Sequence, residues 1–302
     1  MSKLILFDGN AIMHRAYHAL PGDMKARDGT PTNAVYGLVS MLIRAIEDLE
    51  PTHIAFAFDR PEPTFRKEIL PDYQGHRPEM DDDLGVQFPL AQGVINAFGI
   101  SVYDKAGYEA DDIIGTIATS AVQKGEVDSV VIITGDRDIL QLVNDKIKLY
   151  MPVKGLANAK IFGDRETVER MGVAPKLIID LKALTGDPSD NYKGVPGIGP
   201  VTAIKLLKEY ETLDSIYKNI DKITGKTQSL LKEHKDSAYQ SQDLARIRDD
   251  VKIKFDVKQM KDWQIDSPKV LNKFEEIGFR TLKKRVQAFG SELIAKKQMS
   301  LI

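Results

Sequence analysis

The sequence contains no cysteine among its 302 residues. Disulfide bonds, thiolate catalysis and zinc sites built on cysteine are therefore excluded, and the composition suits a cytoplasmic protein. Apolar runs are short, and none approaches the roughly 20 residues that a membrane-spanning helix needs. Charge of one sign is not in excess, since the formal net charge is −2. That balance gives no global sign of nucleic-acid binding, although acidic residues clustered in a site would hide a basic face elsewhere.

What the chain does contain is an alternation of short β-branched or aromatic runs with longer helical patterns. The runs typical of buried parallel strands are KLILF from residue 3, HIAFAF from 53, ISVY from 100, SVVIIT from 129 and IKLYM from 147. Between them, residues 32–49 and 109–125 have the 3.6-residue apolar period of amphipathic helices. The alternation predicts an α/β fold with a largely parallel central sheet flanked by helices, and an active site at the carboxyl ends of its strands.

Two changes of pattern divide the chain. Residues 64–98 are broken by prolines, carry several basic side chains and are too long for a simple connection, so we expect a functional insertion or a mobile segment there. From about Gly186 onward the strand signals fade, and the chain becomes helical and richer in lysine. We therefore expect an α/β core over residues 1–185, a helical region over 186–290 and a tail over 291–302.

Nine acidic residues stand mostly at the end of a strand-like run or the start of a helix. They are Asp8, Asp59, Glu109, Asp111, Asp112, Asp136, Asp138, Asp187 and Asp190. Any one of them is explained as well by a helix cap or a solvated charge. Carboxylates that converge on one pocket repel each other unless divalent cations neutralise them, and two hard metal ions indicate phosphoryl chemistry. Capping does not explain the repetition after successive strands, so we predict a metal pocket.

Residues 195–207, VPGIGPVTAIKLL, are the sharpest local signal. Gly197 and Gly199 permit a tight turn with exposed backbone N–H groups, and a packed helix begins directly afterwards. A helix N-terminus that presents amides and is followed by Lys205 and Lys208 is suited to binding phosphate. This is the pattern of a helix–hairpin–helix, expected here over residues 190–209, which holds a DNA backbone without reading its sequence. The alternative is that the glycines only shape a turn between two helices.

Six segments together resemble the bacterial 5′-nuclease family, which comprises the 5′→3′ exonuclease domain of DNA polymerase I and free-standing flap-endonuclease relatives. In family order they are DGNAIMHRAYHAL, TNAVYGLVSML, FDRPEPTFRKEILPDYQGHRP, EADDIIGTIA, TGDRDILQLV and GDPSDNYKGVPGIGPVTAIKLL, and they cover residues 4 to about 210. The resemblance implies a PIN-like 5′-nuclease fold. It also implies a structure-specific exonuclease and flap endonuclease that cuts DNA at 5′ flaps, gaps or 5′ ends in RNA-primer removal, replication and repair. No polymerase module follows, so a stand-alone monomeric nuclease is expected.

The resemblance also implies a ligand set for two Mg²⁺ or Mn²⁺ ions, which would generate a hydroxide nucleophile and stabilise the leaving oxygen. One ion would lie among Asp8, Asp59, Glu109 and Asp111, and the other among Asp136, Asp138, Asp187 and Asp190, with Asp112 near their junction. Residues 64–98 correspond to the helical arch of the family, through or under which the 5′ strand passes. The implied catalytic and DNA-contacting residues are Arg15, Phe65, Arg66, Lys67, Tyr73, Gln74 and Arg77. The resemblance further suggests K⁺ at the hairpin.

One position departs from the family. Where Tyr-Lys usually stands before the arginine of the arch motif, this chain has Tyr73 followed by Gln74. A neutral amide cannot supply a cation to position and polarise the scissile phosphate. Two hypotheses follow: Lys67 or Arg66 compensates, or the enzyme is slower than its relatives.

The chain ends in Gln298-Met299-Ser300-Leu301-Ile302. These residues resemble the short Gln-x-x-Leu-hydrophobic peptides with which bacterial replication proteins bind the sliding clamp. An ordinary amphipathic tail end is the alternative.

Three other functions compete with the nuclease. A phosphatase of the haloacid dehalogenase type requires a second aspartate at the first strand, where this chain has Asn10. A DNA-structure-binding protein without catalysis predicts the loss of several acidic residues, yet all nine are present. A PIN-like ribonuclease shares the acidic α/β core but usually lacks the arch and the hairpin.

Overall fold

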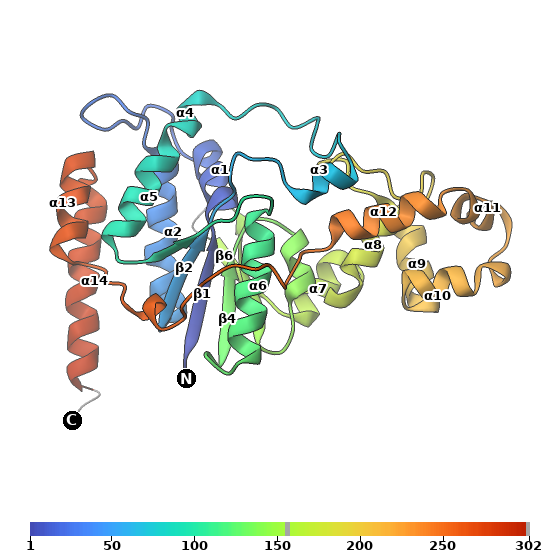
Figure 1. The fold of residues 1–302 in the computed structure, drawn as a ribbon. Helices are drawn as coiled ribbons and strands as arrows, with labels where there is room; N and C mark the ends of the chain where they lie inside the picture. The colour runs from blue at the N-terminus through green and yellow to red at the C-terminus, as the bar shows by residue number, and fades with distance from the viewer. Residues whose placement is uncertain (155–157, 300–302) are drawn as a thin grey trace.

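The structure, a computed structural model, describes residues 1–154 and 158–299, and within them a six-stranded sheet forms the centre (Figure 1). Its strands are β1 (Lys3–Asp8), β2 (His53–Ala57), β3 (Ser101–Tyr103), β4 (Ser129–Ile133), β5 (Ile147–Lys154) and β6 (Asn158–Phe162). The strand order is β3-β2-β1-β4-β5-β6, with β6 antiparallel to β5 and every other pair parallel. The predicted fold class, a largely parallel sheet flanked by helices, is confirmed.

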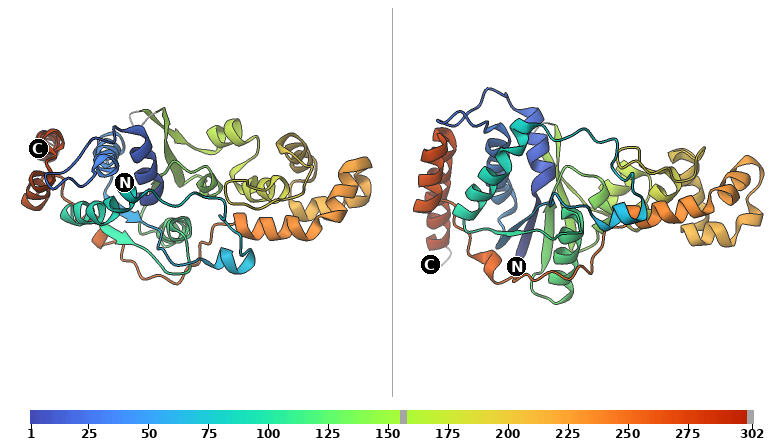
Figure 2. Two further views of the ribbon diagram at one scale, coloured as in Figure 1. Left: turned by 90° about the horizontal axis from the view of Figure 1, so that it is seen from above. Right: turned by 45° about the horizontal axis from the view of Figure 1, so that its top comes forward.

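Both faces of the sheet are buried along its central strands β1, β2 and β4, which explains why these strands are almost entirely apolar. Along β1, Leu4 and Leu6 pack into the cluster that includes α6 (Ala110–Gln123), whereas Ile5 and Phe7 pack on the opposite face. That second face is covered by α1 (Gly9–Ala19), α2 (Asn33–Leu49) and α5 (Gln87–Ala97), which carry much of its buried cluster. Figures 1 and 2 show these helices on either side of the strands.

The segment between β2 and α5 arches over the edge of the sheet where β1 ends (Figures 1 and 2). It contains only the short helices α3 (Phe65–Ile69) and α4 (Asp82–Gly85), joined by turns and irregular backbone. The last part of the expected arch belongs to the core instead, because Val94 and Ile95 of α5 are fully buried. The predicted helical arch over residues 64–98 is therefore corrected to an arch over about 64–86, with little helix.

The region after β6 is helical, but it lies on two sides of the sheet. On one side are α7 (Asp164–Met171), α8 (Ile178–Thr185), α9 (Pro200–Tyr210), α10 (Leu213–Lys218), α11 (Gly225–Glu233) and α12 (Lys235–Ala245). On the other are α13 (Pro268–Ile277) and α14 (Arg280–Met299) (Figure 1). Short 3₁₀ helices are η1 (Asp138–Leu142), η2 (Pro175–Leu177), η3 (Ile220–Lys222) and η4 (Gln259–Lys261). The expected single helical region over 186–290 is thus split in space, because Phe274 of α13 packs on Phe98 after α5.

The helices around the hairpin share a core with the sheet. Leu207 of α9 and Leu231 of α11 belong to the same buried cluster as Leu6 of β1, so the change of pattern near Gly186 does not separate two cores. No helix in the described part of the chain is long and apolar enough to cross a membrane. Of the clamp-like peptide, residues 300–302 lie outside the described residues, and so do the side chains of 298 and 299.

Candidate metal centre and nucleic-acid interface

The first group of acidic residues gathers where β1, β2 and β4 end. Asp8, the last residue of β1, is only 3% exposed. Its carboxylate accepts hydrogen bonds from the Ala11 amide at 2.9 Å and from the Thr134 hydroxyl, just beyond β4, at 2.7 Å. Asp8 is therefore the N-cap of α1, and it is also close enough to Asp59 and Asp136 for their charges to act on its carboxyl. Burial raises its pKa to about 7, against the opposing effect of those two hydrogen bonds.

The start of α6 brings further carboxylates to the same place. Burial raises the pKa of Asp111 well above its usual range, and the charges of Asp136, Asp8, Glu109 and Asp59 raise it further. Side chains from three other segments, and one from the same helix start, therefore act on one carboxyl, as convergence on a single site requires. Asp59 is fixed there by the Ala110 amide, which donates to its Oδ1 at 2.6 Å.

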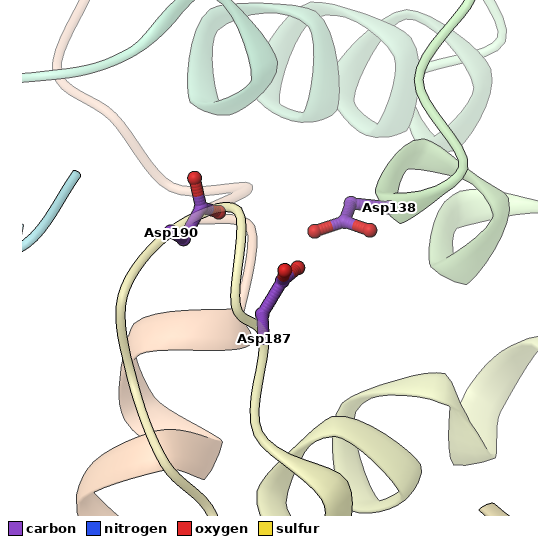
Figure 3. Close-up of side chains that lie close together, drawn as sticks. All are labelled: Asp138, Asp187 and Asp190. Atoms are coloured by element: carbon purple, nitrogen blue, oxygen red, sulfur yellow. The ribbon is translucent and has the colours of Figure 1, made fainter. Parts of the chain in front are cut away.

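A second group is formed by Asp138 on η1 and by Asp187 and Asp190 on the loop after α8. One ligand oxygen from each of the three lies within 4.8 Å of the others, and Figure 3 shows the carboxylates of Asp138 and Asp187 pointing toward each other with Asp190 beside them. They line an open cavity of about 450 Å³ together with Asp136 and Arg77. Burial raises the pKa of Asp138 to about 6, although the nearby Lys182 opposes the rise.

The loop that carries Asp187 and Asp190 is held in a tight shape by close backbone packing. Gly186 and Gly194 have φ values of +70° and +61°, and a Cβ on Gly194 would stand 2.2 Å from the Gly186 nitrogen. Only glycine fits that approach. Paired backbone hydrogen bonds between Asp187 and Tyr192, at 2.8 and 3.1 Å, close the loop. Two metal-ligand candidates are therefore placed by the segment that continues into the hairpin.

The sequence analysis missed Lys182 on α8. Its ammonium lies between Asp138 and Asp187 and forms an ion pair with each. Burial would raise the pKa of Asp187, but Lys182 and the two hydrogen bonds from Ser189 together outweigh that effect and hold the pKa below its usual value. The only sequence signal is that Lys182 stands five residues before Asp187 near the end of an apolar helix, which is a spacing without a distinctive meaning.

Arg66 and Asp112 do not have the roles predicted for them. Arg66 is 2% exposed, and its guanidinium binds the Asp112 carboxylate at 2.7 and 3.0 Å and the backbone oxygens of Leu244 and Arg246. Asp112, fully buried, also accepts from the amides of Glu109 and Arg248. Because all these groups are occupied, the prediction that Arg66 contacts phosphate and Asp112 lies in the metal pocket is wrong in this structure. Compensation for Gln74 by Arg66 is excluded by the same burial.

Other arch residues converge on Asp190. The Tyr73 ring is 3% exposed, so the predicted stacking face does not exist; instead its hydroxyl donates to Asp190 at 3.3 Å. Gln74 and Arg77 donate to the same carboxylate at 3.2 and 2.6 Å. Lys67 is exposed on α3. Arg77 thus lies at the pocket with about half of its side chain open to solvent, as a phosphate-contacting residue requires.

Two further predicted residues, Arg15 and Phe65, lie in different surroundings. Arg15 on α1 lies beside Gly135, where a Cβ added to the glycine would stand 3.7 Å from the arginine Nη1. Phe65 is half-buried, and its ring packs on Tyr108 and on the guanidinium groups of Arg66 and Arg248. Asn10, the position at which the phosphatase would need aspartate, accepts from the Asp59 amide at 3.0 Å and ties β2 to α1.

The hairpin forms as the sequence predicts, with one change of boundary. Residues 190–199 are not helical, so the first helix of the motif is α8 and the second is α9, which begins at Pro200. Gly197 has φ +92°, and a Cβ there would meet Leu230 at 2.9 Å. Lys205 and Lys208 are exposed on α9, and Val201 at its start is 85% exposed. The turn therefore presents backbone amides and two cations to solvent.

The donors of the pocket fit divalent cations. Every candidate ligand is a carboxylate oxygen, the type that Mg²⁺ and Mn²⁺ prefer. The ammonium of Lys182 already occupies a cation position between Asp138 and Asp187. Of the nine predicted ligands, four line the open cavity: Asp136, Asp138, Asp187 and Asp190. Asp8, Asp59, Glu109 and Asp111 form a neighbouring group whose charges act on one another and on which the charge of Asp136 also acts, and Asp112 is paired with Arg66.

Models of known protein families match most of the chain. The family model of the 5′-3′ exonuclease N-terminal resolvase-like domain matches residues 3–172, and that of the 5′-3′ exonuclease C-terminal SAM fold matches residues 173–268. The chain belongs to the 5′-3′ exonuclease family. The two domain matches meet at residues 172 and 173, ahead of the boundary expected from composition.

Similar curated proteins are much longer than this chain. DNA polymerase I of Bacillus subtilis (strain 168) is 38% identical over 301 residues, which is 99% of this chain and 34% of that protein. DNA polymerase I of Mycobacterium tuberculosis (strain ATCC 25618 / H37Rv) is 39% identical over 286 residues, or 94% of this chain and 31% of that protein. The chain thus spans about a third of the length of the curated relatives it matches.

Solved structures of flap nucleases share the fold. A flap endonuclease of bacteriophage T5, solved as a pseudo-enzyme–product complex with DNA and metal ions, superposes with a TM-score of 0.66 at 20% identity, over 96% of this chain and 99% of that one. Flap endonuclease-1 from Methanococcus jannaschii gives a TM-score of 0.60 at 16% identity, over 98% and 93% of the two chains. At these identities the likeness concerns the fold.

Proposed function

We propose that this protein is a Mg²⁺- or Mn²⁺-dependent, structure-specific 5′ nuclease that hydrolyses DNA phosphodiesters at 5′ flaps, gaps or 5′ ends. The observation that carries the proposal is the loop between α8 and α9. It supplies Asp187 and Asp190 to the acidic pocket and continues directly into the phosphate-binding turn at Gly197. One continuous segment thus carries both the amides proposed to bind the DNA backbone and two of the proposed metal ligands.

Each part of the site has a distinct role. The amides at the start of α9, with Lys205 and Lys208, hold the backbone of the duplex without reading bases. The arch over the pocket admits the 5′ strand, and Arg77 at its inner side contacts the scissile phosphate. Arginine suits this role because its planar fork matches phosphate oxygens. Arg15 is proposed as a further phosphate contact from the α1 side of the pocket.

Asp8, Asp59, Glu109 and Asp111 form one ligand group and Asp138, Asp187 and Asp190 the other, with Asp136 between them. Asp136 fits that place because its charge acts on Asp8, Asp111 and Asp138 alike. Bound divalent cations supply a hydroxide nucleophile at neutral pH and stabilise the charge of the leaving oxygen. The protein groups align the phosphate, and no side-chain nucleophile is needed.

The wider biological role follows from the family. RNA-primer removal, replication and repair are the processes in which a 5′ nuclease of this type acts, in the cytoplasm of a bacterium and as a monomer. K⁺ at the hairpin and a sliding clamp bound through Gln298–Ile302 stay predictions.

The test is a substrate panel of equal sequence. A 5′-flap duplex, a gapped duplex, a blunt duplex and a 3′-flap duplex, each labelled at the 5′ end of the strand to be cut, are incubated with Mg²⁺ or with chelator. We expect Mg²⁺-dependent release of the labelled 5′ fragment from the first two substrates. Removal of the 3′ flap, or equal rates with chelator, would contradict the proposal, whereas short products released from the 5′ ends of the blunt and 3′-flap duplexes are the exonuclease activity that it includes.

A further inference from the structure

The arch turn from Asp72 to Arg77 is a preformed unit. Within it, the Gly75 amide donates to the Asp72 carbonyl at 2.9 Å and the Arg77 amide to the Gln74 carbonyl at 3.0 Å. Gln74 has φ +58°, a conformation that side chains other than glycine and asparagine seldom adopt. A strained residue of this kind persists only where its surroundings fix it, and such positions cluster at functional sites.

What fixes this turn is the loop at Asp190 and Asn191, more than a hundred residues away in sequence. Three side-chain donors end on the Asp190 carboxylate, from Tyr73, Gln74 and Arg77. A second set does not involve that carboxylate. The backbone N–H of Gln74 donates to the backbone carbonyl of Asp190 at 3.0 Å. The side-chain amide of Asn191 donates to the backbone carbonyl of Asp72 at 2.8 Å and to the Asp72 carboxylate at 2.6 Å.

The two sets respond differently to a divalent cation. A cation bound by Asp190 occupies the carboxylate oxygens that now accept hydrogen bonds from Gln74 and Arg77. Those hydrogen bonds are therefore replaced when the cation binds. The bonds of Asn191 are to Asp72, which lies outside the pocket lining, and they persist. In the cation-loaded protein the arch turn is then held by the Asn191 side chain, by the bond from the Gln74 backbone N–H to the Asp190 carbonyl and by the buried Tyr73 ring. Asn191 supplies the side-chain hydrogen bonds of this attachment that do not end on the Asp190 carboxylate.

We propose that Asn191 is a positioning residue that keeps Arg77 at the pocket once a divalent cation has bound the Asp190 carboxylate. Asn191 does so through its hydrogen bonds to Asp72. The inference rests on the proposed function, which makes Arg77 a phosphate contact. The Arg77 guanidinium is then released from Asp190 while the arch turn stays in place, so the guanidinium can donate to a phosphate oxygen. The Gln74 side chain is released from the same carboxylate, but it is neutral. The positive charge that the arch turn can offer to a phosphate is therefore that of Arg77.

The direct test measures where the arch lies, without substrate. Because the chain has no cysteine, spin labels can be placed at Glu79→Cys on the arch and Glu126→Cys after α6, both exposed. The variant is Asn191→Gly, because the φ of +60° at this position suits glycine and removing the amide group adds no backbone strain. We expect the parent to give one narrow distance distribution with chelator and with Mg²⁺. Asn191→Gly should stay narrow with chelator and broaden with Mg²⁺. A distribution that stays narrow with Mg²⁺ would overturn the proposal.

Cleavage gives a second readout. In single-turnover cutting of a 5′-flap duplex at saturating Mg²⁺, Asn191→Gly should be at least about tenfold slower, the usual scale for losing hydrogen bonds to a charged partner. Asp72→Ala should show a smaller loss, and Asp72→Asn, which keeps both acceptors, should recover most of it. Asn96→Ala on the exposed side of α5 is the matched control and should equal the parent. Equal rates for Asn191→Gly and parent would contradict the positioning role.

A failure of the proposed function can be distinguished from a failure of the role proposed for Asn191. If the parent cuts no flap substrate, the proposed function is wrong, whatever the spin labels show. If the parent cuts and Asn191→Gly matches it in rate and in distance, only the role of Asn191 is wrong. Asp72→Ala, an exposed substitution, keeps the test valid should Asn191→Gly fail to fold.

Discussion

The guanidinium of Arg66 and the carboxylate of Asp112 form a two-point salt bridge in the interior, with donor–acceptor distances of 2.7 and 3.0 Å. The pair ties the start of the arch to α6. Through the backbone oxygens of Leu244 in α12 and of Arg246 just after it, the pair also ties the arch to the helical side of the molecule. It therefore supports the position of the arch rather than contacting substrate.

Breaking this pair should destabilise the fold. Asp112→Ala leaves the Arg66 charge and two backbone amides without their acceptor, and we expect it to lower the free energy of unfolding by about 3–5 kcal/mol. Asp104→Ala removes the acceptor of an exposed pair with Arg60 and should cost less than about 1 kcal/mol. Urea denaturation monitored by circular dichroism measures both. Equal losses in the two variants would show that the buried pair has no special structural role.

Lys182 should compete with divalent cations for the second acidic group. Lys182→Met removes the ammonium between Asp138 and Asp187 but keeps an unbranched side chain of similar length. Because one positive charge is lost a few ångströms from the site, the affinity for Mg²⁺ should rise by about tenfold or more in the absence of DNA. Isothermal titration calorimetry checks this, with Lys176→Met, an exposed lysine on η2, as the control. Weaker Mg²⁺ binding by Lys182→Met would show that the lysine holds the carboxylates in place instead.

The acidic pocket predicts a pH-dependent stability that divalent cations remove. Burial raises the pKa of Asp8 and that of Glu109 from 3.8 and 4.5 to about 7. A carboxyl whose pKa is raised on folding stabilises the fold while it is protonated, and this contribution is lost as the pH rises through the folded-state pKa. With chelator, the free energy of unfolding should therefore fall between about pH 4 and pH 7, by several kcal/mol, since one pKa unit corresponds to about 1.4 kcal/mol.

Melting temperatures with chelator and with Mg²⁺ measure this effect across that pH range. Mg²⁺ should raise the melting temperature strongly at pH 7.5 and weakly at pH 5, where protonated carboxyls bind it poorly. The difference between the two profiles isolates the pocket from carboxyls elsewhere. A difference that does not change with pH would contradict the assignment.

The lysines of α9 should contribute to DNA affinity through phosphates alone. For a duplex bound in Ca²⁺, Lys205→Ala and Lys208→Ala should each weaken binding and reduce the slope of log affinity against log salt by about 0.9, the value for one phosphate contact on duplex DNA. The loss should be the same for duplexes of different sequence. Lys269→Ala, exposed on α13 away from the hairpin, is the control. An unchanged slope in both α9 variants would exclude this face as the duplex site.

Local sequence patterns predict much of the fold because each strand or helix is indicated by a short stretch of neighbouring residues. Five strands and the helices α2 and α6 follow from apolar runs and periodicity, and α9 follows from its glycines and Pro200. The antiparallel strand β6 is not predicted, because NAKIF has a weak apolar signal. The end of the predicted arch is misplaced because the apolar pattern of α5, which buries Val94 and Ile95, follows the insertion without a clear break.

Side-chain roles that depend on distant contacts cannot be predicted in the same way. Arg66 and Asp112 have the residue types of a phosphate contact and a metal ligand, and only the approach of Leu244 and Arg246 shows that they are a buried pair. Lys182 escapes prediction because a single lysine on an apolar helix carries no distinctive signal. The convergence of the other acids is predictable, since the carboxyl ends of parallel strands meet at one edge.

The most direct test of the central claim, that the convergent carboxylates hold catalytic metal, is single-turnover cleavage of a 5′-flap duplex across a Mg²⁺ titration. The variants are Asp136→Asn and Asp190→Asn, with Asp104→Asn as an exposed control. We expect no product with chelator, saturable cleavage by parent and control, and a loss of at least about a hundredfold in both pocket variants, the scale of removing one electrostatic stabiliser. Cleavage by Asp136→Asn at the parent rate, or cleavage that survives chelation, would contradict the account.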